Sequence, residues 1–429
     1  MMMKKILIIA DDLSGAADCA IGFTRAGHRV VVMLDAVREQ RDPDADTTAI
    51  DTDTRRLTPA QAAARTADAF RTLRDPQHRL YKKIDSTLRG NWAAEVAALQ
   101  RDAGLAIVAP AFPATGRVLR GGRVFVHGTP LEQTPTWQLE NAGRDANIAT
   151  MLNEAGLSTD VLDGDALRDD PAGLAARIAA SAAAGIQALI VDTQNEHALR
   201  TLARVTLDSD VPLFWVGSGG LARELSALTR RPGVEQGVKA SANTVADARH
   251  PDRPVLALVG SLSAVSERQC ALLVERTGIE QLIVPPDVLR HGAAHPDWNA
   301  LRAQIGATLS ARADLLVRIG RDNAFDPAEG AHLSTSLAEL VEPHFARVGG
   351  LIATGGETAR AMLSAARIPS LHLQAEIEAG VAVGRPLDTN RAHRPGIVTK
   401  AGAFGTDHAL YAAWLTLRNE TEPDHVVPH

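Results

Sequence analysis

Two aspartates stand side by side at the end of the first apolar segment of the chain. The segment KILIIA, residues 5–10, is followed by Asp11 and Asp12 and, after one leucine, by the small-residue run SGAA. Ionised carboxylates repel each other and are costly to bury without partners. We therefore expect a ligand, a cation or the N-cap of a following helix at this position.

Charged residues also follow two other apolar segments of the N-terminal half. The segment DTDTR ends in Arg55, and the segment KKIDSTLR contains Lys83, Asp85 and Arg89. The carboxyl ends of parallel strands meet at one edge of a sheet, where open α/β folds bind ligands. Carboxylates there accept hydrogen bonds from hydroxyl groups, and cations bind a carboxylate or a phosphoryl group in transfer. The alternative interpretation is that KKIDS begins a helix, with Asp85 or Ser86 as its N-cap.

The C-terminal half contains three short loops of small residues, each between a predicted strand and a predicted helix. They are VGSLSAVSE, ATGGETARA and TKAGAFGTDHA, which begin at Val259, Ala353 and Thr399. Such loops let backbone N–H groups and a helix dipole approach an anion. Each glycine alone has a backbone explanation, but three such loops in one half of the chain indicate a polyphosphate ligand. The chain has no Walker A pattern and none of the H-R-D or D-F-G signatures of protein kinases.

A competing nucleotide motif occurs before the middle of the chain. The segment VGSGGLA, residues 216–222, matches the dinucleotide-binding pattern G-x-G-x-x-G/A and follows an apolar segment. That pattern requires an acidic residue at the end of a strand about 20 residues later. Here that distance falls in a segment without periodicity, so an NAD-dependent dehydrogenase is the weaker alternative.

Length, charge and cysteine content limit the class of protein. The 429 residues exceed the roughly 250–300 at which one hydrophobic core stops growing, so we expect two domains. A net charge of -6 argues against non-specific binding to nucleic acid. Two cysteines suggest a reducing compartment, and the N-terminus has neither a signal-peptide core nor a membrane-spanning run. We expect a cytoplasmic protein that binds neither nucleic acid nor membrane.

Short apolar runs alternate with helical patterns along the chain, which is typical of βαβ units with a mostly parallel sheet. In the N-terminal half, strands are predicted over residues 5–10, 29–34, 47–53, 79–85, 105–110, 188–193 and 212–217. The segment GRVLRGGRVFVHGTP, residues 116–130, instead predicts an inserted β-hairpin that turns at Gly121 and Gly122. Because residues 229–254 lose periodicity, we expect a domain over 1–235, a linker over 236–254 and a second domain over 255–429.

Six motifs in order make the chain resemble the four-carbon acid sugar kinase family over nearly its whole length. They are IIADDLSGAAD, YKKIDSTLRGNW, PAFPATGRVLRGGRVFVHGTPLEQT, VGSLS, ATGGETARA and TKAGAFG. The resemblance implies a two-domain α/β protein with an N-terminal sugar-acid domain and a C-terminal ATP domain. It also implies transfer of the γ-phosphoryl group of ATP to the 4-hydroxyl of a tetronate. D-threonate is the expected acid, with D-erythronate and 3-oxo-tetronates as alternatives.

The resemblance also implies roles for individual residues. The acid sugar would be bound by Asp12, Arg55, Lys83, Ile84, Asp85 and Ser86. ATP would be bound by Ser261, Gly355, Gly356, Glu357, Thr358 and Gly402.

The general base is left open by the resemblance, and among the candidates Asp12 comes before Asp85. Lys83 is the expected cation beside the migrating phosphoryl group, with Lys82 pointing to the opposite face of its strand. We expect Asp12 to face the sugar hydroxyls and Asp11 to be held by backbone N–H groups of the following helix. Mg²⁺ is expected to bridge the phosphates, but no acidic cluster in the C-terminal half identifies its ligands.

Two further points concern function class and assembly. A non-catalytic sugar-acid sensor would use the same sugar-acid residues, and consumption of ATP on addition of a tetronate distinguishes an enzyme from a sensor. A dehydrogenase would instead turn over a nicotinamide cofactor. A homodimer is an expected assembly.

Overall fold

The computed structural model describes residues 5–37, 41–163, 170–234, 252–323, 326–389 and 391–418. The chain divides into two compact units, Met1–Val234 and Glu235–His429. Residues 236–251 of the expected linker lie outside the described residues.

The first unit contains a parallel sheet with the strand order β2-β3-β1-β4-β11-β5-β10-β9. Its strands are β1 (Lys5–Ala10), β2 (Val30–Met33), β3 (Thr47–Asp51), β4 (His78–Lys83), β5 (Leu105–Ala109), β9 (Thr159–Leu162), β10 (Ala188–Val191) and β11 (Leu213–Gly217). All but β9 were predicted. Strand β9 lies at the edge of the sheet and only its last residue is buried, so its sequence lacks the continuous apolar run of a buried strand.

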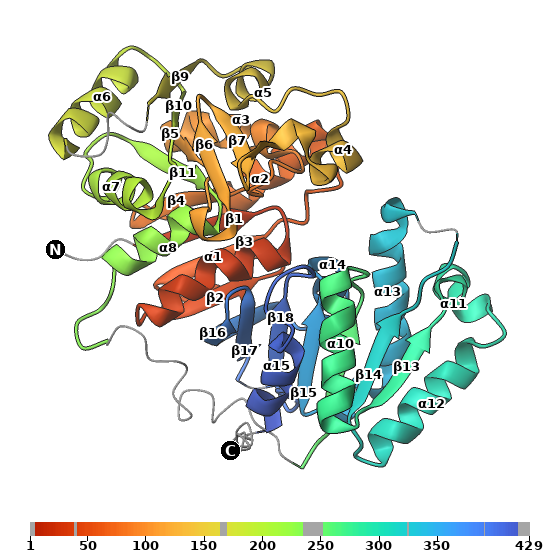
Figure 1. The fold of residues 1–429 in the computed structure, drawn as a ribbon. Helices are drawn as coiled ribbons and strands as arrows, with labels where there is room; N and C mark the ends of the chain where they lie inside the picture. Colours follow the sequence, from red (N-terminus) through yellow and green to blue (C-terminus); the bar gives the residue numbers. More distant parts are fainter. Residues whose placement is uncertain are drawn as a thin grey trace, which may run out of the picture. The chain divides into compact units, whose positions relative to one another are not determined.

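Helices cover both faces of this sheet. They are α1 (Leu13–Arg25), α2 (Pro59–Leu73), α3 (Trp92–Ala103), α4 (Pro135–Asn141), α5 (Ile148–Glu154), α6 (Pro171–Ala183), α7 (Glu196–Leu207) and α8 (Gly219–Leu228). On one face α1 packs on α8, α8 on α7 and α7 on α6, whereas α2 and α3 pack together on the other (Figure 1). Helix α2 begins at a capping box in which Thr58 and Gln61 bind each other's backbone N–H groups.

The predicted hairpin is confirmed as a separate small sheet of β6 (Arg117–Arg120), β7 (Arg123–Val126) and β8 (Thr129–Pro130). Gly121 and Gly122 form its two-residue turn with φ of +58° and +67°, as a type I′ turn requires. Both of their N–H groups donate to the carboxylate of Asp192, with 3.0 Å from Gly122 N to Oδ1. The turn is therefore fixed to the end of β10.

The second unit contains a mixed sheet with the order β13-β14-β12-β15-β18-β17-β16. Its strands are β12 (Val255–Val259), β13 (Glu280–Val284), β14 (Leu315–Ile319), β15 (Gly350–Thr354), β16 (Ser370–Glu378), β17 (Val381–Pro386) and β18 (Gly396–Lys400). The five strands β13, β14, β12, β15 and β18 are parallel to one another, whereas β17 is antiparallel to both β18 and β16. Two domains with mostly parallel sheets confirm the expected fold class.

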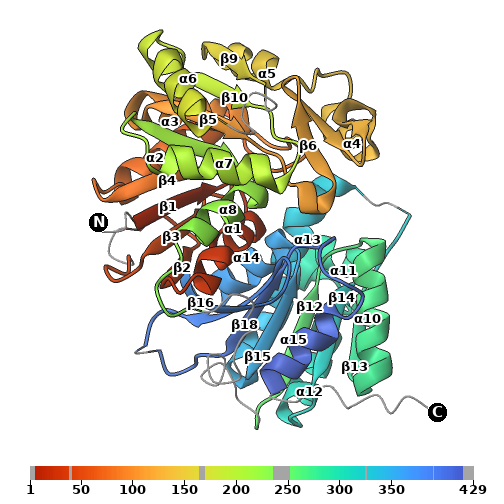
Figure 2. The same cartoon turned by 60° about the vertical axis from the view of Figure 1, so that its left-hand side comes forward.

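The helices of the second unit also lie on both faces of its sheet (Figure 2). They are α10 (Ala264–Thr277), α11 (Pro286–His291), α12 (Trp298–Ser310), α13 (Gly330–Val341), α14 (Gly356–Ala365) and α15 (Ala409–Arg418). Helices α10 and α15 pack together over a core that includes Val259 of β12 and Cys270 of α10. No helix in the described part of the chain is long and apolar enough to cross a bilayer.

Candidate functional site

Three neighbouring strands of the first unit bring the predicted charged residues to one edge. Strand β1 pairs with β3 on one side and with β4 on the other, and Ala10 lies opposite both Asp51 and Lys83. Asp11 and the segments after Asp51 and Lys83 therefore leave the sheet together, as the sequence predicts.

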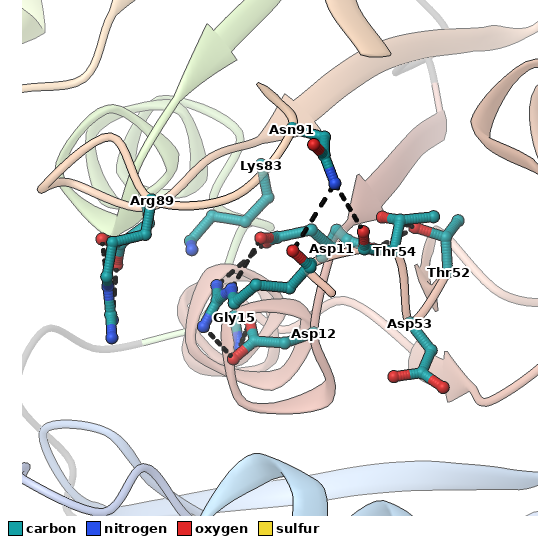
Figure 3. Close-up of polar contacts among 12 residues, drawn as sticks. Asp11, Asp12, Gly15, Thr52, Asp53, Thr54, Lys83, Arg89 and Asn91 are labelled. Atoms are coloured by element: carbon teal, nitrogen blue, oxygen red, sulfur yellow. Dashed lines mark hydrogen bonds and ion pairs between the residues drawn. The ribbon is translucent and has the colours of Figure 1, made fainter. Parts of the chain in front are cut away.

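Arg55 binds both adjacent aspartates. Its Nε and Nη2 donate to Asp11 Oδ2 and Oδ1 at 2.8 and 3.1 Å, and its Nη1 donates to Asp12 Oδ2 at 3.0 Å (Figure 3). The Asp11 side chain is only 3% exposed, whereas that of Asp12 is 24% exposed. One guanidinium thus compensates the repulsion between the carboxylates and leaves Asp12 accessible from solvent.

These contacts shift the pKa values of the pair. Burial acts to raise the pKa of Asp11, but the charges of Arg55 and Lys82 hold it below its usual value. Burial likewise opposes the charged form of Arg55, yet Asp11 and Asp12 raise its pKa well above the usual value. Asp11 and Arg55 are consequently both ionised.

Asp12, not Asp11, caps α1, so the expectation for Asp11 was wrong. Asp12 has extended backbone angles, and its Oδ1 accepts a hydrogen bond from Gly15 N at 2.9 Å. Asp11 is held by Arg55 instead of by backbone N–H groups. The one-residue difference places Asp12 at the N-cap position, where a short acidic side chain reaches the first turn of the helix.

Lys83 points from the end of β4 toward the start of α1 (Figure 3). A Cβ atom on Gly15 would lie 2.8 Å from Lys83 Nζ, so a larger residue there would displace the ammonium group. The Lys83 side chain is 6% exposed and has no hydrogen bond or ion pair to any residue that the structure describes. Burial acts to lower the pKa of Lys83, but neighbouring negative groups, including Asp12, raise it. The site thus contains a cation that is available to a ligand.

Lys82 points to the opposite face, as strand alternation predicts. Its Nζ lies 2.9 Å from Oε2 of Glu95 on α3, and both side chains are completely buried. The other oxygen of Glu95 accepts hydrogen bonds from Thr54 and Thr66. This network lies beneath the charged edge and supports the segment that carries Arg55.

Asp85 is engaged by its own loop. It accepts hydrogen bonds from Arg89 Nε at 2.9 Å, from Arg89 Nη2 at 3.2 Å and from the N–H and hydroxyl of Thr87. Burial acts to raise the pKa of Asp85, but Arg89 holds it well below its usual value. No helix begins here, because α3 starts only at Trp92. The alternative interpretation of KKIDS as a helix start was therefore wrong.

Ile84 and Ser86 lie in the same loop and are both buried. The Ile84 side chain has no exposed surface, and its N–H donates to Gly217 O at 2.8 Å. Ser86 is 8% exposed. The Ile84 N–H group is thus already used within the first unit.

Three residues that sequence reasoning did not select support this edge. Asn91 donates from Nδ2 to Thr54 O at 3.0 Å and to Leu57 O at 2.7 Å, which holds the loop around Arg55 (Figure 3). Glu95 pairs with Lys82, and Arg117 lies close enough to Asp85 and Arg89 to interact with their charges. No spacing signal marks them, because each lies on a different element from its partner.

The small-residue loops of the second unit converge. The Gly402 carbonyl accepts hydrogen bonds from Ser263 Oγ at 3.2 Å and Ser266 Oγ at 2.8 Å. A Cβ on Gly402 would lie 2.6 Å from Ser261 Oγ, and one on Gly355 would lie 3.9 Å from Ser261 N. The loops after β12, β15 and β18 therefore meet around Ser261.

The GGET segment begins α14 with a turn that needs glycine. Gly355 is its N-cap residue with φ of +101°, and its N–H donates to Lys400 O at 2.9 Å. Gly356 and Glu357 are half-buried in the first turn. Thr358 is 2% exposed, and its hydroxyl lies 3.1 Å from Ser334 Oγ. The Thr358 side chain thus packs inside the second unit.

Lys400 holds the loop after β18 through hydrogen bonds to its carbonyl groups. Its Nζ donates to the carbonyls of Ala401, Gly402 and Phe404 at 3.0, 2.9 and 3.0 Å. Burial lowers the pKa of Lys400 to about 8. The ammonium group is therefore committed to the loop that contains Gly402.

Comparison with known proteins identifies both units. A family described as the sugar-binding N-terminal domain matches residues 6–225, and one described as the nucleotide-binding C-terminal domain matches residues 256–410. The chain is 51% identical over 424 residues to a D-threonate kinase of Cupriavidus necator, covering 97% of this chain and 99% of that one. The chain belongs to the four-carbon acid sugar kinase family.

Other relatives of this four-carbon acid sugar kinase are more distant. A 3-oxo-tetronate kinase of Methylobacterium radiotolerans is 30% identical, over 92% of this chain and 95% of that one. A crystal structure of a Salmonella typhimurium protein has a TM-score of 0.79 at 23% identity, covering 96% of this chain and 99% of that one. The crystal structure shows that the fold is shared.

The dinucleotide-like motif of this kinase has a packing role. A Cβ on Gly220 would lie 2.3 Å from Ala111 O, and one on Gly219 would lie 2.5 Å from Asp18 Oδ2. Ser218 caps α8, and its carbonyl accepts a hydrogen bond from the Tyr81 hydroxyl at 2.5 Å. These glycines therefore allow α8 to approach the neighbouring chain, which explains the motif without a nicotinamide cofactor.

Metal ligands are not evident from side-chain clustering in this kinase. Within the described ranges, no three His, Cys, Asp or Glu side chains gather as a metal site. Mg²⁺ in kinases is usually held by substrate phosphates, waters and only one or two carboxylates.

Proposed function

We propose that this kinase transfers the γ-phosphoryl group of ATP to the 4-hydroxyl of D-threonate, forming 4-phospho-D-threonate. The observation that carries the proposal is the 51% identity to a D-threonate kinase over nearly the full length of both chains. D-erythronate and 3-oxo-tetronates are the alternative acids, and a relative named a 3-oxo-tetronate kinase is 30% identical. The reaction is proposed to occur in the cytoplasm, with no nucleic acid or membrane partner.

The sugar acid is proposed to bind the first unit at the edge formed by Asp12, Arg55 and residues 83–86. Carboxylate oxygens there can accept hydrogen bonds from sugar hydroxyls, and the cations can bind the acid group. Asp11 is excluded from direct contact with hydroxyls, because Arg55 binds both of its oxygens and its side chain is buried.

Asp12 is the proposed acceptor of the 4-hydroxyl proton. Its carboxylate is partly exposed, and its oxygens each accept one hydrogen bond, from Arg55 and from Gly15 N. Asp85 is less suitable, because Arg89 and Thr87 occupy its oxygens and its low pKa makes it a weak base. We assign Asp85 to holding Arg89 and the 84–89 loop in place.

Lys83 is proposed to donate to the phosphoryl group during transfer. Phosphoryl transfer depends mainly on positioning and on stabilisation of the oxygen charge, which a fixed ammonium group supplies. The supporting observation is that Lys83 is almost fully buried yet lacks a partner among the described residues. Such a group lowers the energy of the anionic transferring group without reorganisation.

The nucleotide is proposed to bind the second unit through Ser261, Gly355, Gly356, Glu357 and Gly402. The first turn of α14 presents N–H groups beside Ser261 and Gly402, as an anion site requires. Thr358 is assigned to packing through its hydroxyl contact with Ser334. Mg²⁺, bound to the phosphates, would neutralise part of their charge.

A substrate panel tests the proposal. The purified chain should consume ATP with Mg²⁺ when D-threonate is added, with a higher kcat/KM than for D-erythronate, L-threonate or a 3-oxo-tetronate. Phosphorus NMR of the product should show a phosphate ester on C4. Preference for another tetronate would correct the substrate, and binding of a tetronate without ATP consumption would support the sensor alternative.

A further inference from the structure

One arginine of the second unit has a solvent-inaccessible Nε without a hydrogen-bond partner among the described residues. Arg318 is the penultimate residue of β14, its side chain is partly buried, and its Nε is inaccessible to solvent and makes no hydrogen bond. No described residue forms a hydrogen bond or an ion pair with the Arg318 guanidinium. Burial of an uncompensated charge is costly, so such a side chain is informative when it lines a cavity.

The side chain of Arg318 points to the face of the sheet covered by α10. In the strand register Arg318 lies beside Val259 of β12, and residues beside each other share a face. Val259 packs in the core cluster with Cys270 of α10. The positive charge of Arg318 also acts on the Cys270 thiol, which independently places the two groups close together.

Arg318 lines a recess with a residue of the proposed nucleotide site. The recess is small, with a volume of about 10 Å³, and its lining includes Ser261, Ser266, Cys270 and Arg318. Glu267 also lines it, but that carboxylate lies 2.9 Å from Arg321 Nε. The acidic group at this position is thus already neutralised by another arginine.

The residues proposed to bind the nucleotide include no cation. Ser261, Gly355, Gly356, Glu357 and Gly402 provide hydroxyl and backbone groups and one carboxylate. Lys400 donates to three loop carbonyls. A polyphosphate carries several negative charges, so charge balance within the second unit requires a further positive group.

We propose that Arg318 donates hydrogen bonds to a phosphate group of the bound nucleotide, beside Ser261. The inference rests on the proposed nucleotide site and adds a residue to it. Arginine suits this role because its planar guanidinium binds phosphate through two parallel hydrogen bonds. The Arg318 guanidinium, which has no partner among the described residues, would form an ion pair with the phosphate when the nucleotide binds.

The test compares Arg318→Met with Arg276→Met, a change in the last turn of α10, by calorimetric titration of the full-length protein with ATP and with adenosine. Arg318→Met should weaken ATP binding about ten- to a hundredfold, which is the contribution expected of a hydrogen bond to a charged group. Adenosine binding should be unchanged, because adenosine has no phosphate. Arg276→Met should bind both ligands as the wild type does, since Arg276 is exposed at the end of α10 opposite to the Ser261 loop.

Thermal unfolding of the free protein separates ligand binding from a structural role. Removal of an uncompensated buried charge should leave the melting temperature of Arg318→Met equal to or above that of the wild type. A melting temperature several degrees lower, unchanged ATP affinity, or equal loss of ATP and adenosine binding would each overturn the inference. Wild-type protein that binds no ATP would overturn the proposed function as well, whereas an Arg318→Met variant with normal ATP affinity would overturn the inference alone.

Discussion

The Lys83 ammonium group lies where a side chain of residue 15 would be: a Cβ atom on Gly15 would lie 2.8 Å from Lys83 Nζ. The glycine lies in the first turn of α1, and the lysine ends β4. The same Cβ would lie 2.5 Å from Asp12 Oδ1. The small-residue run after the aspartates therefore leaves space for both proposed catalytic side chains.

Gly15→Ala should reduce kcat by about tenfold or more, because displacement of reacting groups by about 1 Å is costly to catalysis. The melting temperature should change little, since the preference of a helix for alanine over glycine, about 0.5–1 kcal/mol, offsets the displacement of the Asp12 N-cap, which costs about 1 kcal/mol. Steady-state kinetics and thermal unfolding check the two parts. Wild-type kcat in the variant would show that the space above Gly15 is not needed for the reaction.

Lys83→Met should cost about 2–4 kcal/mol in the transition state, comparable to loss of one preorganised donor. Since the proposed interaction strengthens during transfer, kcat should fall far more than the KM for the sugar acid rises. Steady-state kinetics with D-threonate and ATP measure this. A change in KM without a change in kcat would show that Lys83 binds the substrate and does not stabilise the transition state.

Lys82→Met should instead affect stability. It leaves Glu95 buried without its ion-pair partner, which costs about 3–5 kcal/mol when one member of a buried pair is removed. Denaturant unfolding should therefore show a large loss for Lys82→Met and a small one for Lys83→Met. Equal stability losses in the two variants would contradict the separation of the two lysines onto opposite faces.

Asp85→Asn should destabilise the protein in a pH-dependent way. The folded-state pKa of Asp85 lies well below the usual 3.8, so its stabilising effect is present above that value and is lost as pH falls through the folded pKa. The difference in unfolding free energy between wild type and variant should be constant above about pH 5 and shrink below about pH 4. Urea unfolding at several pH values measures it, and a difference that grows on acidification would refute the assignment.

The third nucleotide loop should respond to pH through Lys400. Because burial lowers the pKa of Lys400 to about 8, the ammonium group loses its proton at a lower pH in the folded protein than in the unfolded chain. A neutral amine donates only two hydrogen bonds to three carbonyls, so ATP affinity should fall as pH rises through 8. Lys400→Met should bind ATP more weakly than the wild type, with an affinity that does not fall between pH 7 and 9. The same fall in the variant would exclude Lys400 as its cause.

Stability should change with pH in the opposite direction. Between the folded pKa of about 8 and the ordinary value of 10.5, the unfolded state binds more protons at Lys400 than the folded state does. The contribution of Lys400 to unfolding free energy therefore rises with pH in this window. Wild type should gain stability relative to Lys400→Met from pH 8 to 10, as measured by denaturant unfolding.

The amino-acid sequence by itself determined the alternation of strands and helices, the hairpin turn and the positions of the loops proposed to bind ligands. These features depend on local properties: continuous apolar runs, two glycines with positive φ, and small residues after strand ends. The family motifs are also contiguous segments, so Asp12, Lys83 and Ser261 could be selected without coordinates. Edge strand β9 was not predicted, because it is short and only its last residue is buried.

Only the tertiary structure decided which charged residues have partners. Asp11 and Asp12 are adjacent in the chain, yet Arg55, from another element, determines that Asp11 is held and Asp12 is accessible. Ion pairs and hydrogen bonds depend on distances of about 3 Å between elements far apart in sequence, which no local pattern specifies. For the same reason the isolation of Lys83 and Arg318 among the described residues became visible only in three dimensions.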